Sequence, residues 1–232
     1  HCKMHPQEGV QLSKEISDES VVLLKNENGL LPLNAEKLRS VAVIGPNADQ
    51  VQFGDYTWSR NNKDGMTPLA GIRQLLGDKV TVRYEKGCSL VSLDTSGIKK
   101  AVEVARQSEV AIVFCGSASA ALARDYKSST CGEGFDLNDL NLTGAQSQLI
   151  KEVYETGTPV VLVLVTGKPF TISWEKKHIP AILTQWYAGE QAGNSIADIL
   201  FGKISPSGRL TFSFPQSTGH LPVYYDYLPS DK

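Results

Sequence analysis

The sequence has no long apolar run and no excess of charge of either sign. Its longest apolar stretch, PVVLVLVTG (159–167), has the length of a strand and is far below the roughly 18 residues of a membrane-spanning helix. Lys and Arg together number 23 against 25 Asp and Glu, which gives a formal net charge of −2, and the basic residues are scattered. We therefore expect neither nucleic acid nor an anionic membrane as a partner.

Cysteine is scarce, with only Cys2, Cys88, Cys115 and Cys131, and no two of them form a CxxC pair. The four histidines are far apart in the sequence, so the spacing of zinc ligands is absent and no metal site is predicted. Free thiols are the favoured interpretation. The alternative is a disulfide that involves Cys131, which scattered cysteines in an oxidising compartment would allow.

The composition is that of a globular protein, with 41% hydrophobic and 21% charged residues in 232. This length suits one sizeable core or two small ones. The first residues, HCKMHPQEG, contain neither an initiator Met nor a signal peptide. We interpret the chain as a piece processed or excised from a longer polypeptide.

Apolar runs and amphipathic segments alternate along the chain. The predicted strands are 40–45, 79–85, 109–116, 159–167, 179–187 and 209–214. The predicted helices are 8–29, 67–77, 96–108, 143–157 and 190–202. Two helix starts are specified by sequence: Thr67 as the cap before Pro68, and Thr143 with Gln146 as a capping box.

This alternation predicts a largely parallel sheet with helices on both faces, that is, a single three-layer α/β sandwich. We expect six strands, of which 209–214 alternates like an antiparallel edge strand. The pattern is continuous and contains no internal repeat, so we predict one domain over residues 1–232. Within it, residues 1–35 form a linker helix and entry, and residues 218–232 begin an exit tail.

Two connections are far longer than the others, 46–66 and 117–142. Unstructured loops of more than 20 residues in a compact domain are usually functional or disordered. Both follow predicted strands, so both lie at the carboxyl edge of the sheet, where open α/β sheets bind ligands. The segment 188–193 follows another strand and joins them. These three loops predict one working face.

The second long loop contains Glu133 between two glycines. The GEG sequence is not a dinucleotide fingerprint, VTGKP lacks the spacing of a P-loop, and GSASA lacks the second glycine of a hydrolase elbow. An acid on such a loop suits proton donation to a leaving group, which glycoside hydrolysis requires together with a second carboxylate. The alternative is a solvated loop acid.

Aromatic residues lie in the same three loops. Tyr56 and Trp58 belong to the first long loop, and rings of this kind stack on sugar faces, although core or hinge packing is an equal alternative for this pair. For Trp186 and Tyr187, at the end of a predicted strand, packing is the favoured interpretation.

Several blocks of sequence, in order and over nearly the whole chain, resemble the C-terminal α/β-sandwich domain of glycoside hydrolase family 3. They are ESVVLLKNENGLLPL (19–33), VAVIGPNA (41–48), CGEGFDLNDLNLTGAQSQLI (131–150), PVVLVLVTGKPF (159–170), QWYAGEQAGNSIADILFGKISPSGRLTFSFP (185–215) and GHLPVYY (219–225). The resemblance implies a retaining, exo-acting β-glucosidase or β-xylosidase. In that family the domain follows a catalytic barrel and often precedes a fibronectin-type-III-like domain, and neither lies in these 232 residues.

The resemblance also implies residue roles. Glu133 in CGEGFD matches the acid/base position, while the nucleophilic Asp belongs to the barrel. The acid/base loop varies between subgroups, so Asp125 in LARDY is the alternative acid. The segment GDYTWSRNNKDG (54–65) matches the one that lends aromatic rings to the leaving-group subsite, which assigns substrate contacts to Trp58 and Tyr56.

The partners implied are an oligosaccharide or aryl β-glycoside substrate and the N-terminal barrel of the same polypeptide, and no metal or organic cofactor is implied. We expect a periplasmic or secreted protein and an isolated chain without activity. The alternative function is a non-catalytic carbohydrate-binding or structural module of the same fold.

Overall fold

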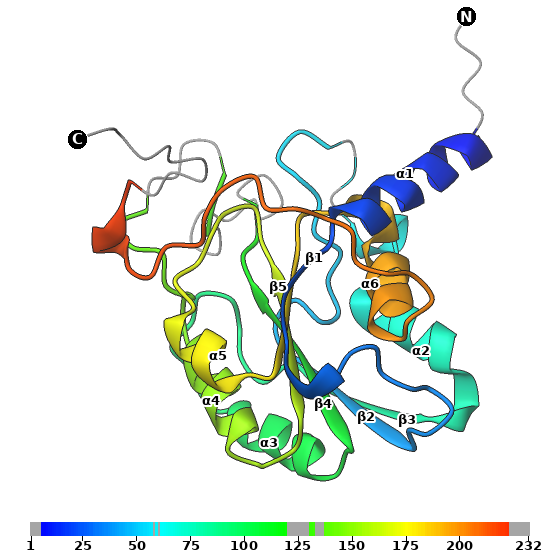
Figure 1. Ribbon diagram of the computed structural model, residues 1–232, viewed down its shortest axis with the longest axis horizontal. Helices are drawn as coiled ribbons and strands as arrows, with labels where there is room; N and C mark the ends of the chain where they lie inside the picture. Colours follow the sequence, from blue (N-terminus) through cyan, green and yellow to red (C-terminus); the bar gives the residue numbers. More distant parts are fainter. Residues whose placement is uncertain (1–5, 58, 60, 120–129, 133–136, 223–232) are drawn as a thin grey trace, which may run out of the picture.

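The computed structural model describes residues 6–57, 59, 61–119, 130–132 and 137–222 (Figure 1). Its strands are β1 (Val22–Asn26), β2 (Ser40–Ile44), β3 (Thr81–Glu85), β4 (Val110–Gly116), β5 (Val160–Val165) and β6 (Ala181–Gln185). They form one sheet in the order β1-β6-β5-β4-β2-β3, in which only β1 runs antiparallel to its neighbour. The predicted six-stranded, mostly parallel sheet with one antiparallel edge strand is confirmed.

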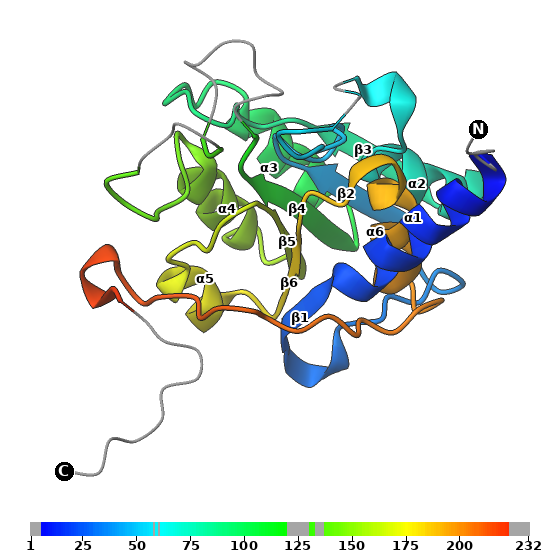
Figure 2. The same cartoon turned by 90° about the horizontal axis from the view of Figure 1, so that it is seen from above.

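Helices cover both faces of the sheet (Figure 2). They are α1 (Pro6–Ser20), α2 (Pro68–Leu76), α3 (Ile98–Arg106), α4 (Gln146–Tyr154), α5 (Ser173–His178) and α6 (Ala192–Leu200). On β4, Ile112 and Phe114 pack with α2 and α6, whereas Val113 and Cys115 face the cluster that includes α3 and α4. Because β4 is buried on both sides, its sequence is a continuous apolar run rather than an alternating one.

The edge strand was assigned to the wrong segment. Residues 209–214 form no strand, and β1, predicted as the end of a helix over 8–29, is the antiparallel strand beside β6. Helix α1 ends at Ser20, and the next residues pair with β6. In the segment 209–214, Phe212 packs edge-on against Trp186, with 5.3 Å between ring centroids. The alternation of apolar residues in 209–214 therefore reflects the packing of its aromatic rings. Which segment becomes the edge strand depends on tertiary pairing with β6.

One predicted helix start is confirmed and the other is wrong. The Thr67 hydroxyl accepts a hydrogen bond from the Ala70 backbone N–H at 3.1 Å, and Pro68 is the first helical residue. In contrast, α4 begins at Gln146, and the Thr143 hydroxyl donates to the Leu90 carbonyl at 2.6 Å instead of capping the helix. The short helix α5 was not predicted.

Candidate functional site

The four predicted site residues divide between described and undescribed parts of the chain. Glu133, Asp125 and Trp58 lie outside the described residues. Tyr56 is described, and 84% of its surface is exposed, so the alternative of core packing is wrong for this ring. The described residues on either side of these positions show where the three loops begin and which contacts hold them there.

The three loops begin at the same edge of the sheet, as predicted. Strands β2 and β4 are parallel neighbours, so the segments that follow them start side by side (Figure 1). Backbone hydrogen bonds join the loop after β6, residues 188–193, to the end of the loop 46–66 that follows β2. The Met66 N–H donates to the Glu190 carbonyl at 2.7 Å, and the Gly193 N–H donates to the Met66 carbonyl at 2.9 Å.

A close helix crossing holds this connection in place. A Cβ atom on Gly193 would lie 2.1 Å from the Thr67 carbonyl oxygen, and one on Gly71 would lie 2.2 Å from the Gly193 carbonyl oxygen. Only glycine therefore allows α2 and α6 to approach this closely. Gly193, the last residue of AGEQAG, is thus required for helix packing.

The second long loop has a closed stem. The Thr130 N–H donates to the Ala118 carbonyl at 3.2 Å, and the Ala118 N–H donates to the Thr130 hydroxyl at 2.9 Å. Ser119 and Cys131 form an isolated bridge next to this pair. These residues are buried, so the chain leaves a fixed stem at Gly132, one residue before Glu133. Residues 120–129 and 133–136 of this loop lie outside the described residues.

The stem contacts the end of one further strand, β6. The Tyr187 hydroxyl, just after β6, lies 2.7 Å from both the Ser117 hydroxyl and the Cys131 thiol. The pKa of Tyr187 is raised by burial and by the neighbouring Cys131, so the phenol stays protonated and can donate a hydrogen bond. Packing was the predicted role of Tyr187, and its link between loops was missed.

Sequence reasoning also missed Lys168, the residue that directly follows the predicted strand 159–167. It is only 8% exposed, and its ammonium lies 5.0 Å from the centre of the Phe170 ring. No described residue accepts a hydrogen bond from its Nζ atom. Burial lowers the pKa of Lys168, because the charged form loses hydration.

The described cysteines are free thiols, as favoured from the sequence. Cys88, Cys115 and Cys131 are all buried, and none of them forms a disulfide. Burial raises the pKa of Cys88 to about 11 and raises that of Cys115 as well, so both thiols stay neutral. Within the described ranges, no group of three or more His, Cys, Asp or Glu residues is arranged to hold a metal ion.

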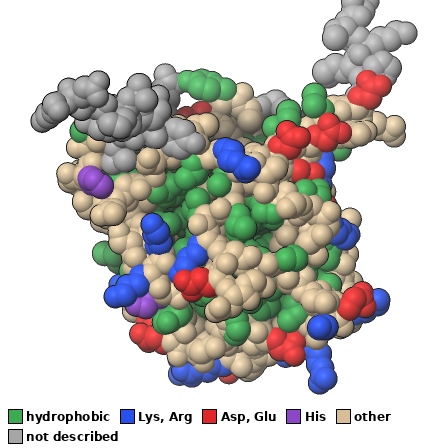
Figure 3. All heavy atoms as spheres, viewed as in Figure 1, with side chains coloured by type: hydrophobic (Ala, Val, Ile, Leu, Met, Phe, Trp, Pro, Cys, Tyr) green, Lys and Arg blue, Asp and Glu red, His purple; other side chains and the backbone are tan. Residues whose placement is uncertain are grey.

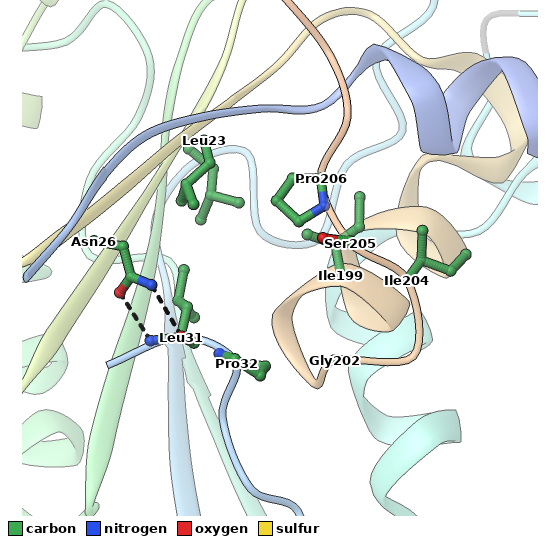
Figure 4. Close-up of a pocket in the computed structure, with 10 residues that line it drawn as sticks. Leu23, Asn26, Leu31, Pro32, Ile199, Gly202, Ile204, Ser205 and Pro206 are labelled. Carbon is green, nitrogen blue, oxygen red and sulfur yellow. Dashed lines mark hydrogen bonds between the residues drawn. The ribbon is translucent and has the colours of Figure 1, made fainter. Parts of the chain in front are cut away.

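An apolar hollow of about 320 Å³ lies elsewhere, beside β1 and the end of α6 (Figure 4). Leu23, Leu31, Ile199 and Ile204 are among its lining residues, and the Asn26 side chain is held by two hydrogen bonds to Leu31. None of its lining residues has an ionisable side chain, so this hollow has no group for acid/base chemistry.

Figure 3 shows side chains of both charge signs on one face of the described part of the chain. On the face seen in Figure 3, basic and acidic side chains lie interspersed among apolar and neutral ones. None of the described helices is both long and apolar enough to cross a membrane.

Comparison with known proteins identifies the family. The family model described as the glycosyl hydrolase family 3 C-terminal domain matches residues 21–232, and the chain belongs to this family. It is 36% identical to a β-xylosidase of Formosa agariphila over 96% of this chain and 31% of that protein. It is 37% identical to a periplasmic β-glucosidase of Salmonella typhimurium over 93% of this chain and 30% of that protein.

Solved structures agree with this assignment. A crystal structure of β-glucosidase from Listeria innocua superposes with a TM-score of 0.84 at 31% identity, covering 97% of this chain and 29% of that one. The chain therefore spans about three tenths of the length of the relatives it matches.

Proposed function

We propose that this chain is the second domain of a retaining exo-β-glycosidase that removes terminal β-linked glucose or xylose. The observation that carries the proposal is family membership over residues 21–232, a range that contains CGEGFD. The relatives named β-xylosidase and β-glucosidase are about three times as long, which leaves room for a catalytic barrel in the same polypeptide.

In this proposal Glu133 is the general acid/base, with Asp125 as the alternative. As a barrel carboxylate attacks the anomeric carbon, Glu133 donates its proton to the departing glycosidic oxygen. It then takes a proton from the water that hydrolyses the glycosyl-enzyme. The buried stem that ends at Cys131 supports this role, because a catalytic acid needs a fixed point of departure close to it.

The nucleophile is proposed to come from outside this chain. A retaining pair needs carboxyl groups about 5–5.5 Å apart on either side of the scissile bond. Two acids of the first loop are already engaged, since Thr67 donates to Asp49 at 2.8 Å and Ser59 donates to Asp64. The exposed ring of Tyr56 supports a place in the leaving-group subsite, together with Trp58.

The substrate is proposed to be an oligosaccharide or aryl β-glycoside, and the setting periplasmic or secreted. A relative named as a periplasmic β-glucosidase supports the setting. The alternative, a non-catalytic carbohydrate-binding or structural module, predicts the same fold without turnover.

The test compares this chain with the complete polypeptide on nitrophenyl β-glucoside and β-xyloside. We expect no turnover by the chain alone, turnover by the complete polypeptide, and a strong loss in Glu133→Gln. Glu103→Gln, an exposed acid on α3, is the matched control and should keep full activity. A complete polypeptide with no glycosidase activity would favour the non-catalytic module, and selective loss in Asp125→Asn would move the acid/base role there.

A further inference from the structure

Tyr187 occupies a position that only a glycine opposite makes available. Its ring lies against Gly167, where an added Cβ atom would come within 2.8 Å of the Tyr187 Cε2 atom. Gly167 follows β5 and Tyr187 follows β6, so the ring lies between the carboxyl ends of two adjacent parallel strands. This contact fixes where the phenol hydroxyl can point.

The hydroxyl is the centre of a chain of hydrogen bonds. It lies 2.7 Å from Cys131 Sγ on one side and 2.7 Å from Ser117 Oγ on the other. The Ser117 hydroxyl donates to Thr166 Oγ1 at 3.2 Å, and the Thr166 hydroxyl donates to the Lys168 carbonyl at 2.6 Å.

The hydroxyls of Ser117 and Thr166 donate onward, which leaves the Ser117 oxygen free to accept the Tyr187 proton. The Cys131 thiol lies within reach of two acceptors, the Tyr187 hydroxyl oxygen and, at 3.7 Å, the Ala118 carbonyl of the stem. Chains in which each group donates to the next strengthen their members cooperatively in a low-dielectric interior. Tyr187 is the one member that joins Cys131 to the ends of β4 and β5.

We propose that Tyr187 is a positioning residue for the loop that carries the catalytic acid. By joining Cys131 to Ser117, its hydroxyl fixes the stem from which the chain continues to Glu133, two residues later. This inference rests on the proposed acid/base role of Glu133. Tyr187 itself acts through the stem and needs no contact with substrate.

The first experiment measures the stem directly in this chain, through the rate at which iodoacetamide labels each cysteine. Loss of one net hydrogen bond in Tyr187→Phe should raise the labelling rate of Cys131 about 2- to 12-fold. Cys88 and Cys115 belong to the core cluster under α3 and α4, which does not include Cys131, and should label at unchanged rates. Tyr154→Phe on α4 is the matched control and should change none of the three.

Two results of this experiment would overturn the inference. The labelling rate of Cys131 could stay the same in Tyr187→Phe, which would show that the hydroxyl does not hold the stem. All three thiols could instead label faster by the same factor, which would show a general loss of stability. Ser117→Ala breaks the chain at its next member and should repeat the selective effect if Tyr187→Phe folds poorly.

The second experiment measures catalysis in the complete polypeptide. Misplacing a catalytic group by about 1 Å can cost up to about 10²-fold in rate. We expect Tyr187→Phe to lower kcat about 10-fold on an alkyl β-glycoside, which needs protonation of its leaving group, and far less on a dinitrophenyl β-glycoside. KM should change little. Cys131→Ala should behave in the same way, while Cys131→Ser keeps a donor and should restore most of the rate.

The outcomes separate this inference from the proposed function. Equal losses on both substrates in Tyr187→Phe, with a selective loss in Glu133→Ala, would overturn the positioning role and leave the acid/base role standing. An unselective effect of Glu133→Ala would overturn the proposed function and this inference with it. Selective losses in both variants, with faster labelling of Cys131, are the result that we expect.

Discussion

Gln146 offers the sharpest test of how the working edge is held, through the variant Gln146→Leu. This fully buried side chain bonds both backbone groups of Gly116, the last residue of β4. Its Oε1 accepts from the Gly116 N–H at 2.7 Å, and its Nε2 donates to the Gly116 carbonyl at 3.0 Å. Leucine has a similar volume and can make neither bond.

The expected cost follows from the groups left behind. A buried donor or acceptor without a partner costs about 1–3 kcal/mol, so two of them cost about 2–6 kcal/mol. The Leu90 carbonyl, a third partner of Gln146, keeps its bond from the Thr143 hydroxyl and adds little. Burial of the new apolar side chain offsets part of the loss. We expect Gln146→Leu to lower the free energy of unfolding by about 2–5 kcal/mol.

The assay is urea unfolding of this chain, with the midpoint as the readout. A slope of roughly 2–3 kcal/mol per molar urea turns the expected loss into a midpoint lowered by about 1–2 M. Gln148→Leu is the matched control on the same helix, since its exposed amide bonds Glu152 and no other described residue, and it should change stability by less than about 0.5 kcal/mol. Coinciding midpoints for the two variants would refute the reasoning.

Two further variants test packing and burial near the same edge. Gly193→Ala should lower the free energy of unfolding by about 1–3 kcal/mol, because its Cβ atom would meet the Thr67 carbonyl. Gly54→Ala is the control: its Cβ atom would lie in open space, so its stability should be nearly unchanged. Similar urea midpoints for the two variants would contradict this prediction. Lys168→Met should be at least as stable as the wild type at pH 7, because it removes a buried ammonium that has no hydrogen-bond acceptor among the described residues. Burial lowers the pKa of Lys168 in the folded state, so between that pKa and about 10.4 the unfolded chain binds more protons than the folded one. The wild type should therefore gain stability relative to Lys168→Met as the pH rises through this window. A stability difference that does not change between pH 7 and pH 10 would contradict the pKa shift.

Much of the fold could be predicted because its strongest signals are local. Strands β4 and β5 are continuous apolar runs, and Thr67 with Pro68 marks a helix start that the structure confirms. The edge strand could not be predicted in this way, since β1 is a short segment whose state depends on pairing with β6, about 160 residues later. The alternation of 209–214 had a different cause, the packing of its aromatic rings.

The candidate site, too, could be predicted only in part from the sequence. A glycine-flanked acid on a long loop is visible in the sequence, but its neighbours alone leave Glu133 open to being a solvated loop acid, and its proposed role comes from the resemblance of CGEGFD to the family. The chain of hydrogen bonds around Tyr187 could not be predicted, because its partners Ser117 and Cys131 are 70 and 56 residues away. Only the sheet order brings those three positions together at one edge.

The central claim is that Glu133 is the acid/base of a glycosidase, and the leaving-group dependence of Glu133→Ala in the complete polypeptide tests it most directly. General acid catalysis is worth about 10²- to 10⁴-fold, and a poor leaving group depends on it most. We predict a loss of this size on an alkyl β-glycoside, a much smaller loss of glycosyl-enzyme formation on a dinitrophenyl β-glycoside, and faster turnover of the latter when azide replaces water as the attacking group. Equal losses on both substrates, with no effect of azide, would contradict the claim.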